Sequence, residues 1–400
     1  MMITFEQALK CILDNTRILP KERVRVENSV GRILIEDVYS TIEMPPFNKS
    51  AMDGYALKAV DIKNVPVKLK NIGLIQAGQM FRKKAGRGEC VKIMTGAALP
   101  QGADTVVMVE DTKQYGAQVE INRTLKRGKN VCVQGEDIKK GQKLLNKGMV
   151  LSTSDVAVLA TTGRQYIKVI KEPKVALLNT GGEIVPTGRR LKKRQIYNSN
   201  GPQFLALLKA DRLNTTFLGI AKDRPAELKR AVRKGLEYDV FLISGGVSMG
   251  DYDLVPEVLK SLGVKEVFHG VKTKPGRPLL FATKKNSIVF GIPGNPVSNF
   301  LVYYIYIRPA LYKMRGYGRC EPKFAEGIVM EPFRHKPGRR HFVPVKIFKK
   351  GARRYLSPVK SHGSADILAL SKADGFMVVS ENTSVVKKGS KANFITWKGF

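Results

Sequence analysis

Gly291-Ile-Pro-Gly-Asn-Pro-Val-Ser298 follows an apolar, strand-like run (Ser287 to Phe290) and opens a long apolar, helix-like run (Val297 to Leu311). A strand, a Gly/Pro turn and a helix N-terminus in this order form a favourable anion site, because the free N–H groups and the positive end of the helix dipole point at a ligand above the strand. Pro293 and Pro296 stiffen the turn, and Gly294 lets a ligand approach the backbone. Taken alone, the stretch is equally consistent with a plain turn, so its neighbours decide the interpretation.

Strand-like and helix-like runs alternate over the preceding hundred residues. They are Val175–Leu178 (strand), Pro202–Ala210 (helix), Thr216–Ile220 (strand), Pro225–Glu237 (helix), Val240–Ile243 (strand) and Leu254–Leu262 (helix). Alternation of this kind predicts a parallel, doubly wound sheet with helices on both faces. Ligands of such sheets bind at the carboxyl ends of the strands.

Polar and glycine-rich loops follow these three strands, and two more such loops come later in the chain. They are Asn179-Thr-Gly-Gly-Glu-Ile184, Ala221-Lys-Asp-Arg224, Ser244-Gly-Gly-Val-Ser-Met-Gly-Asp-Tyr-Asp253, Lys272-Thr-Lys-Pro-Gly-Arg-Pro278 and Pro293-Gly-Asn-Pro296. Carboxylates beside cations and helix N-termini suit a phosphorylated ligand bridged by Mg²⁺, which needs only a few carboxylates in addition to the phosphates. Ordinary loops with solvated charges are the alternative, and five such loops in succession argue against it.

The fold class predicted for the whole chain is α/β with additional β subdomains around this central doubly wound α/β domain, in a multidomain, elongated chain. The predicted domains are 1–48 with 138–172 as an N-terminal linker subdomain, 49–137 as a small β subdomain, 173–318 as the α/β domain and 319–400 as a C-terminal β domain. Short β-type runs broken by glycine mark the small β subdomain, for example Cys90–Met94 and Thr105–Val109.

Composition excludes several classes of protein. No run reaches the ~18–20 apolar residues of a membrane span, and the N-terminal residues lack the pattern of a signal peptide, so we expect a cytoplasmic protein without a membrane contact. The four cysteines form no CxxC pair, which argues against a zinc site or a disulfide framework. The net charge of +35 is spread along the chain and is densest in Arg189–Arg194. We interpret it as a solvated, lysine-rich surface rather than as a specific nucleic-acid footprint.

Together the motifs resemble those of the MoeA and gephyrin E-domain family, the molybdopterin molybdenumtransferases. The matching stretches keep the family order: Pro45-Pro-Phe-Asn-Lys-Ser-Ala-Met-Asp-Gly-Tyr-Ala56, Lys92-Ile-Met-Thr-Gly-Ala97, Gly135-Glu-Asp-Ile138, Asn179–Glu183, Ser244–Gly250, Lys274–Pro278 and Pro293–Ser298. The resemblance implies four subdomains, a homodimer and a reaction. In this reaction molybdate is inserted into adenylylated molybdopterin, the phosphoanhydride is hydrolysed, AMP leaves, and Mg²⁺ assists.

The resemblance also implies a set of site residues. The catalytic set is Asp53, Thr95, Asp137, Glu183, Asp223, Asp253 and Lys274. The molybdopterin- or oxyanion-binding set is Ser244, Gly245, Gly246, Ser248, Arg277, Pro293, Gly294, Pro296, Arg339 and Ser364. Glu183, Asp223 and Asp253 are the candidate Mg²⁺ ligands. As hypotheses of role, Lys274 and Arg339 neutralise oxyanion or phosphate oxygens, and the loop from Ser244 cradles phosphate or pterin.

Two positions depart from the family pattern, and three alternative functions stay open. Gly182 stands where the family usually has an aspartate, and Gly270 where it often has a lysine. The alternatives are a molybdopterin adenylyltransferase, a gephyrin-like binding or scaffold protein, and a nucleic-acid binder driven by charge. Partners implied by the family are the adenylyltransferase and an apo-molybdoenzyme. The sequence does not separate molybdate from tungstate as the physiological anion.

Overall fold

The computed structural model describes residues 2–247 and 253–398. It contains two compact units. The large unit consists of Met1–Arg23, Gly31–Ile33 and Lys168–Phe400, and the small unit of Val24–Val30 and Leu34–Ile167.

A six-stranded sheet forms the centre of the large unit, in the strand order β16-β13-β17-β21-β20-β18. Its strands are β13 (Val175–Thr180), β16 (Thr215–Ala221), β17 (Val240–Ser244), β18 (Lys265–His269), β20 (Leu280–Lys284) and β21 (Ser287–Ile292). The four strands from β16 to β21 pair in parallel, whereas β20 pairs antiparallel with both β21 and β18. The predicted doubly wound α/β domain is confirmed, with one antiparallel strand that the alternation alone did not indicate.

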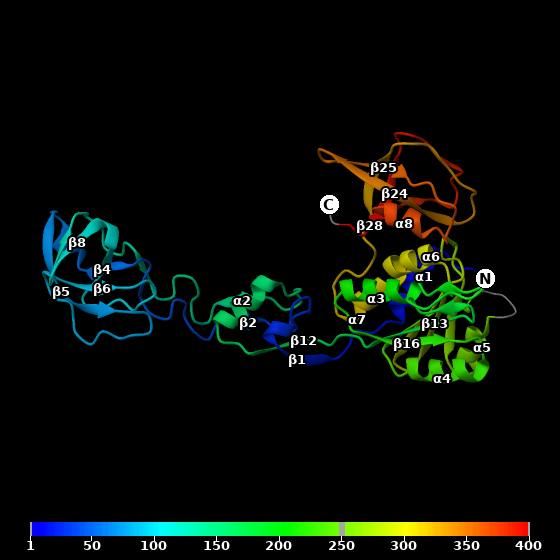
Figure 1. The fold of residues 1–400 in the computed structure, drawn as a ribbon, viewed down its shortest axis with the longest axis horizontal. Helices are drawn as coiled ribbons and strands as arrows, with labels where there is room; N and C mark the ends of the chain where they lie inside the picture. Colours follow the sequence, from blue (N-terminus) through cyan, green and yellow to red (C-terminus); the bar gives the residue numbers. More distant parts are fainter. Residues whose placement is uncertain (1, 248–252, 399–400) are drawn as a thin grey trace. The chain divides into compact units, whose positions relative to one another are not determined.

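Helices cover both faces of this sheet, because successive side chains of each buried strand point to opposite faces. Val175 and Leu177 of β13 pack into one core, and Ala176 and Leu178 into the other. The first core includes residues of α1 (Phe5–Asp14), α3 (Asn200–Ala210), α6 (Pro296–Val302) and α7 (Arg308–Met314), and the second includes residues of α4 (Pro225–Gly235) and α5 (Leu254–Ser261). Figure 1 shows α4 and α5 together on one side of the sheet. A π-helical turn, Tyr303–Ile307, joins α6 to α7.

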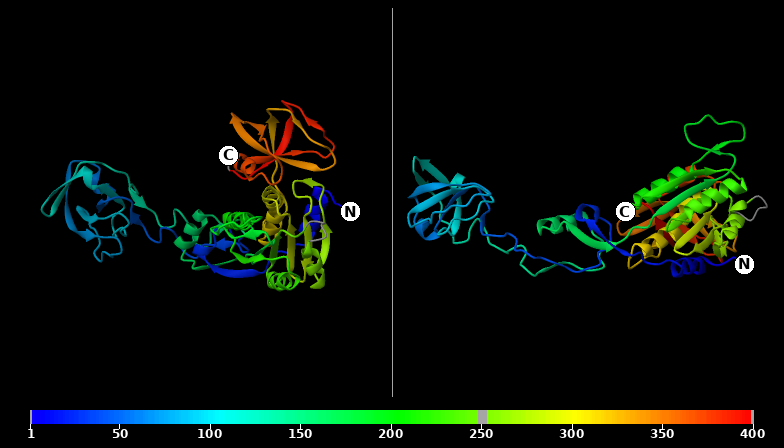
Figure 2. Two further views of the ribbon diagram at one scale, coloured as in Figure 1. Left: turned by 45° about the vertical axis from the view of Figure 1, so that its right-hand side comes forward. Right: turned by 90° about the horizontal axis from the view of Figure 1, so that it is seen from below.

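The C-terminal strands close into a barrel (Figure 2). Its strands are β22 (Ala325–Val329), β24 (Arg340–Lys350), β25 (Arg353–Pro358), β26 (Gly375–Val379) and β28 (Lys391–Thr396). Strand β24 pairs with both β25 and β26, which closes the ring. It also pairs in parallel with β19 (Thr273–Lys274), so that Lys274 lies beside His341. The barrel is accompanied by α8 (Ile367–Lys372), β23 (Phe333–Arg334) and β27 (Val385–Val386).

The small unit is built on a second six-stranded sheet, in the order β7-β4-β6-β5-β9-β8. Its strands are β4 (Gly54–Leu57), β5 (Val67–Ile75), β6 (Glu89–Ile93), β7 (Thr105–Met108), β8 (Thr112–Tyr115) and β9 (Gln118–Ile121). Gly54 is required here, because a Cβ at this position would lie 1.9 Å from the carbonyl oxygen of Val107 on β7. The close packing of β4 against its paired strand β7 therefore fixes the backbone immediately after Asp53.

Short elements complete the chain. They are β1 (Lys21–Arg25), β2 (Val38–Tyr39), β3 (Lys49–Ser50), β10 (Val131–Cys132), β11 (Lys143–Leu145), α2 (Thr153–Thr161), β12 (Tyr166–Ile170), β14 (Ile184–Val185), β15 (Ile196–Tyr197) and the 3₁₀ turns Val26–Asn28, Ala59–Ile62 and Val109–Asp111. Within residues 2–247 and 253–398, no helix has the length and apolar character that crossing a membrane requires.

Candidate functional site

The Ser244-Gly245-Gly246 loop leaves the end of β17 in close contact with the end of β13. Gly245 and Gly246 have φ values of +99° and +63°, in the left-handed region that favours glycine. A Cβ on Gly245 would lie 2.4 Å from the carbonyl oxygen of Thr180. The two glycines therefore allow two strand ends to approach each other. Ser248, which was predicted to bind the ligand, lies outside the described residues.

Ser244 is held from two sides by asparagine side chains. It is only 1% exposed, and its Oγ accepts hydrogen bonds from Nδ2 of Asn200 (3.1 Å) and Nδ2 of Asn299 (3.3 Å). Asn200 Nδ2 also donates to the carbonyl oxygen of Gly294, at 2.7 Å. Asn200 therefore links the glycine loop after β17 to the Pro293–Pro296 turn.

A pair of asparagine side chains lies close to this network. Asn198 Nδ2 donates to Asn179 Oδ1 at 3.2 Å, and the N–H of Gly201 donates to Asn198 Oδ1 at 2.9 Å. Sequence analysis missed Asn198 and Asn200, although the Asn198-Ser-Asn200 triplet at a predicted helix start was a visible signal. Buried amides of this kind rarely lie at random positions, because each needs partners to offset its desolvation. The network therefore positions the two loops that carry the predicted ligand contacts.

We expect Asn200→Ala to destabilise the protein by about 1–3 kcal/mol, because it removes both hydrogen bonds and leaves the buried Ser244 hydroxyl short of a donor. Urea unfolding measures the loss. Asn214→Ala is the matched control, since Asn214 is an exposed amide of the same domain and its loss should change stability by less than about 0.5 kcal/mol. Equal stability of the two variants would contradict the linking role.

The start of α6 offers fewer free N–H groups than the sequence predicts. Pro296 has no N–H, and the Val297 N–H donates to the carbonyl oxygen of Ser364 at 3.1 Å. Asn295 Nδ2 donates to Ser364 Oγ at 2.9 Å. The expectation of a free N–H is therefore wrong for Val297, because a C-terminal segment contacts the helix start. The anion site at this turn stays a prediction.

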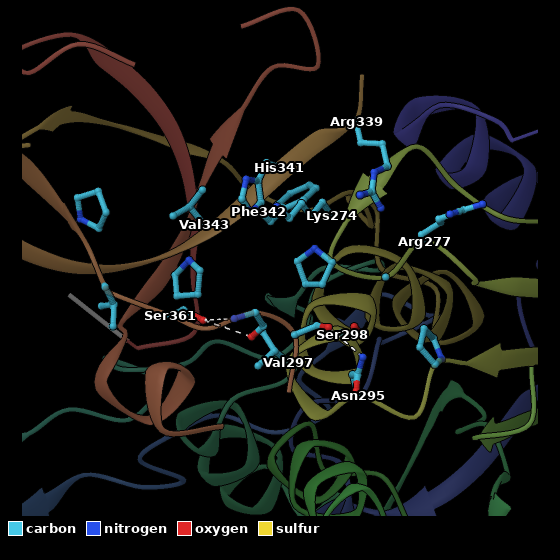
Figure 3. A pocket seen from close by; sticks show the side chains of 18 of the residues that line it. Lys274, Arg277, Asn295, Val297, Ser298, Arg339, His341, Phe342, Val343 and Ser361 are labelled. Atoms are coloured by element: carbon cyan, nitrogen blue, oxygen red, sulfur yellow. Dashed lines mark hydrogen bonds between the residues drawn. The ribbon is translucent and has the colours of Figure 1, made fainter. Parts of the chain in front are cut away.

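A cavity of about 770 Å³ lies between this turn and the C-terminal barrel (Figure 3). Four segments line it: Lys274–Pro278, Pro293–Ser298, Arg339–Pro344 and Pro358–Ser364. Six of the predicted site residues meet here: Lys274, Arg277, Pro293, Gly294, Arg339 and Ser364. Pro296, also predicted, lies within the second of these segments as the first residue of α6.

Positive charge dominates the wall of this cavity. Lys274, Arg277, Arg339 and Lys360 line it, and no carboxylate does among the residues that the structure describes. Figure 3 shows Lys274 and Arg339 across the cavity from Asn295 and Ser298. Ammonium and guanidinium groups around a hydroxyl- and amide-lined wall suit a small oxyanion.

The candidate carboxylates of the α/β domain, Glu183, Asp223 and Asp253, do not line this cavity. Asp223 Oδ2 accepts a hydrogen bond from the N–H of Gly182 at 2.9 Å, and both Asp223 and Glu183 are exposed. A Cβ on Gly182 would lie 3.7 Å from this oxygen, so the usual aspartate of the family would place a second carboxylate beside Asp223. Its absence here leaves Asp223 with less like-charge repulsion. Asp253, half-buried, directly precedes α5.

A second cavity, of about 660 Å³, lies near these carboxylates at the ends of β13 and β16. Its lining includes Gly181, Gly182, Asn198 and four cations, Arg189, Arg190, Lys192 and Lys222. The basic run predicted as a solvated loop therefore contributes to a concave, positively charged surface.

The magnesium prediction needs phosphate ligands as well as protein ligands. No group of three or more His, Cys, Asp or Glu side chains is arranged to hold a metal ion within the described ranges, 2–247 and 253–398. Mg²⁺ is commonly held by one or two carboxylates and the phosphates of the substrate. Asp223, which keeps Oδ1 available while Oδ2 is fixed by Gly182, fits that arrangement.

Asp53 and Thr95 meet in the small unit although 42 residues separate them. The N–H and the hydroxyl of Thr95 donate to Asp53 Oδ1, at 2.6 Å and 2.8 Å. These bonds, the backbone one first, lower the pKa of Asp53, so its carboxylate stays charged at neutral pH. Asp137 is exposed in the same unit, and its N–H donates to the carbonyl oxygen of Met44 at 3.0 Å.

A doubly wound domain with glycine-rich strand ends, β-rich companions and a cationic cavity defines a multidomain α/β protein with a pocket whose charge suits an anionic small molecule. Three family profiles match the chain in order. They are the MoeA N-terminal region (domain I and II) over residues 3–163, a probable molybdopterin binding domain over residues 183–313 and the MoeA C-terminal region (domain IV) over residues 326–397.

Related proteins align with this chain over nearly its whole length. Two proteins named molybdopterin molybdenumtransferase are similar: one from Staphylococcus epidermidis is 31% identical over 398 residues, and one from Staphylococcus aureus is 32% identical over 401 residues. Each alignment covers 98% of this chain and 95% of the relative. The crystal structure of the molybdopterin biosynthesis MoeA protein from Pyrococcus horikosii matches with a TM-score of 0.79 and 32% identity over 100% of both chains. The chain belongs to the MoeA family.

Proposed function

We propose that the protein is a molybdenum-inserting transferase of molybdenum cofactor biosynthesis. It inserts molybdate into the dithiolene of adenylylated molybdopterin, with hydrolysis of the phosphoanhydride and release of AMP. The observation that carries this proposal is the cavity between the Pro293–Ser298 turn and the barrel, which is lined by four cations and, among the described residues, by no carboxylate. The names of the full-length relatives support the same activity.

Within this proposal the two cavities bind different parts of the reactants. The cavity of Lys274 and Arg339 binds the tetrahedral oxyanion, molybdate or tungstate. The basic cavity of Arg189, Arg190 and Lys222 lies beside Asp223 and Glu183, and we assign it to the phosphates of adenylylated molybdopterin.

The carboxylates act on the phosphoanhydride. Bound Mg²⁺ supplies positive charge to phosphate oxygens. Asp223 is the best placed candidate ligand because Gly182 already orients it, and Glu183 and Asp253 are candidates to complete the shell or to hold the attacking water.

We expect Asp223→Asn to lower Mg²⁺-dependent AMP release about 100-fold, because an amide keeps the hydrogen bond from Gly182 but loses the charge that holds the metal. AMP is measured by chromatography after mixing enzyme, adenylylated molybdopterin and molybdate at several Mg²⁺ concentrations. Glu237→Gln, an exposed carboxylate beyond the end of α4, serves as the control and should retain full release. Full release by both Asp223→Asn and Asp253→Asn would contradict the metal assignment.

The same assay separates the alternative functions. An adenylyltransferase would form adenylylated molybdopterin and would not need the barrel side of the cavity, where Arg339 and Ser364 lie. A scaffold protein would release no AMP with any oxyanion. The predicted homodimer, the cytoplasmic location, and the partnership with an adenylyltransferase or an apo-molybdoenzyme stay predictions.

A further inference from the structure

Besides its lysines and arginines, the oxyanion cavity is lined by a histidine that belongs to none of the motifs noted above. His341 lies near the start of β24, where its Cα partners are Lys274 of β19 and Val379 of β26. It lines the cavity and is half-buried. Its buried Nδ1 has no hydrogen-bond partner among the residues that the structure describes. Figure 3 shows it next to Lys274.

The charged groups around His341 are almost all positive. On the cavity side they are Lys274, Arg339, Arg277 and Lys360. Behind it the ring of His335 lies 5.4 Å from the ring of His341, centroid to centroid. Two carboxylates, Glu6 and Glu381, come near this region, and both are paired with Arg340. Because successive residues of a strand point to opposite faces, that ion-pair group lies on the other side of β24.

This environment lowers the pKa of His341 to about 3. Burial is the largest cause, followed by the charges of Lys274, His335 and Arg339. The imidazole is therefore neutral at pH 7 in the free protein, and the cavity is lined by four fixed cations and one uncharged imidazole ring.

A doubly charged oxyanion bound between Lys274 and Arg339 would raise the pKa of His341 again. Its two negative charges offset the two nearest cations, and an oxygen within reach of the ring favours the charged imidazolium as a donor. A group whose pKa rises on binding takes up a proton, and by linkage the ligand then binds more tightly as the pH falls.

We propose that His341 is a specificity-determining residue of the oxyanion cavity, which bonds one oxygen of a tetrahedral dianion and takes up a proton as the anion binds. This inference rests on the proposed function only for the identity of the anion. It makes oxyanion capture a proton-coupled step, which the fixed charges of Lys274 and Arg339 alone would not produce.

The test measures molybdate binding by titration calorimetry, without any pterin substrate. The titrations run between about pH 5 and pH 8, because proton uptake on binding is expected above the free-state pKa of about 3 and up to the ordinary pKa, about 6.5, that the bound imidazole regains. Two buffers of different ionisation enthalpy report the protons taken up. His341→Gln keeps a neutral side chain that hydrogen-bonds but does not titrate, and His341→Lys places a permanent charge. His335→Gln is the matched control, because this neighbouring histidine does not line the cavity.

For the wild type and His335→Gln we expect affinity to be nearly constant above about pH 7 and to rise as the pH falls below about 6.5, by up to about tenfold per pH unit for one proton. For His341→Gln and His341→Lys we expect little pH dependence and no proton uptake from this site, with tighter binding at high pH for the lysine. As an independent readout, the imidazole resonance missing from His341→Gln should move toward its protonated position when molybdate is added to the wild type. The chain has only four histidines, which simplifies the assignment.

Wild-type affinity that does not change with pH, or pH dependence retained in His341→Gln, would overturn the inference while leaving the proposed function intact. If the wild type bound no molybdate yet still released AMP in a molybdate-dependent reaction, this cavity would not be the oxyanion site, and the inference would also fall. Absence of both binding and AMP release would overturn the proposed function as well.

Discussion

Lys274→Ala is expected to lower molybdate-dependent AMP release about 100-fold or more, which corresponds to about 3 kcal/mol of lost stabilisation. Lys274 lies on the short strand β19 and points its ammonium group into a cavity that holds, among the described residues, no carboxylate to compete with the ligand. Because no carboxylate among the described residues of the cavity wall competes for Lys274, the anion can bind its ammonium group directly. The alanine variant loses this contact.

The assay for this prediction compares AMP release with and without molybdate for Lys274→Ala and three further variants. Lys272→Ala is the matched control, because Lys272 is an exposed lysine two residues away that does not line the cavity. Arg339→Lys keeps a charge but loses the planar fork, so a smaller loss is expected than for Arg339→Ala. Lys274→Ala with the same molybdate dependence as Lys272→Ala would show that the cavity does not bind the substrate anion.

Asp53→Ala is expected to lower AMP release by between about 100-fold and 10⁴-fold with little loss of stability, if Asp53 positions a proton or a metal-bound group in the reaction. Its carboxylate is exposed, and the two Thr95 donors that it leaves unpaired can bond to water. The structural role of the pair is therefore small compared with the catalytic role that the family resemblance implies.

Two further measurements separate the roles of Asp53. Asp53→Asn keeps Oδ1 as an acceptor for Thr95 but removes the charge, so it should lose activity almost as fully as Asp53→Ala if the charge matters. Thermal unfolding of each variant reports on folding, with the exposed Asp137→Asn as a comparison in the same unit. Wild-type AMP release by Asp53→Ala, or a large drop in unfolding temperature, would contradict the prediction.

The sequence predicts the α/β domain well because its information is local. Each buried strand is a short apolar run, and helix-like runs separate successive strands from β13 to β17 in the chain. The antiparallel strand β20 was not predicted, because Leu280–Lys284 reads like any other apolar run and its direction depends on the short turn through Lys285, which has a φ of +49°.

The parts of the site that the sequence missed depend on contacts between distant residues. His341 enters the cavity because β24 pairs with β19 across 67 positions of the chain, and no local pattern marks that pairing. The capped helix start at Val297 depends in the same way on Ser364. Lys274, Arg277 and Arg339 were predicted only through motifs, and the spacing of these residues alone gives no reason to place them together.

The contact of Ser364 with the start of α6 has a consequence for how such proteins can diverge. One wall of the oxyanion cavity belongs to the region that matches the molybdopterin-binding profile, and the other to the region that matches the C-terminal profile. On the proposed function, anion preference would depend on both matched regions of the chain. A recombination that exchanged only one of the two regions would replace only part of the cavity lining. We therefore expect substitutions in the two regions to be correlated in evolution.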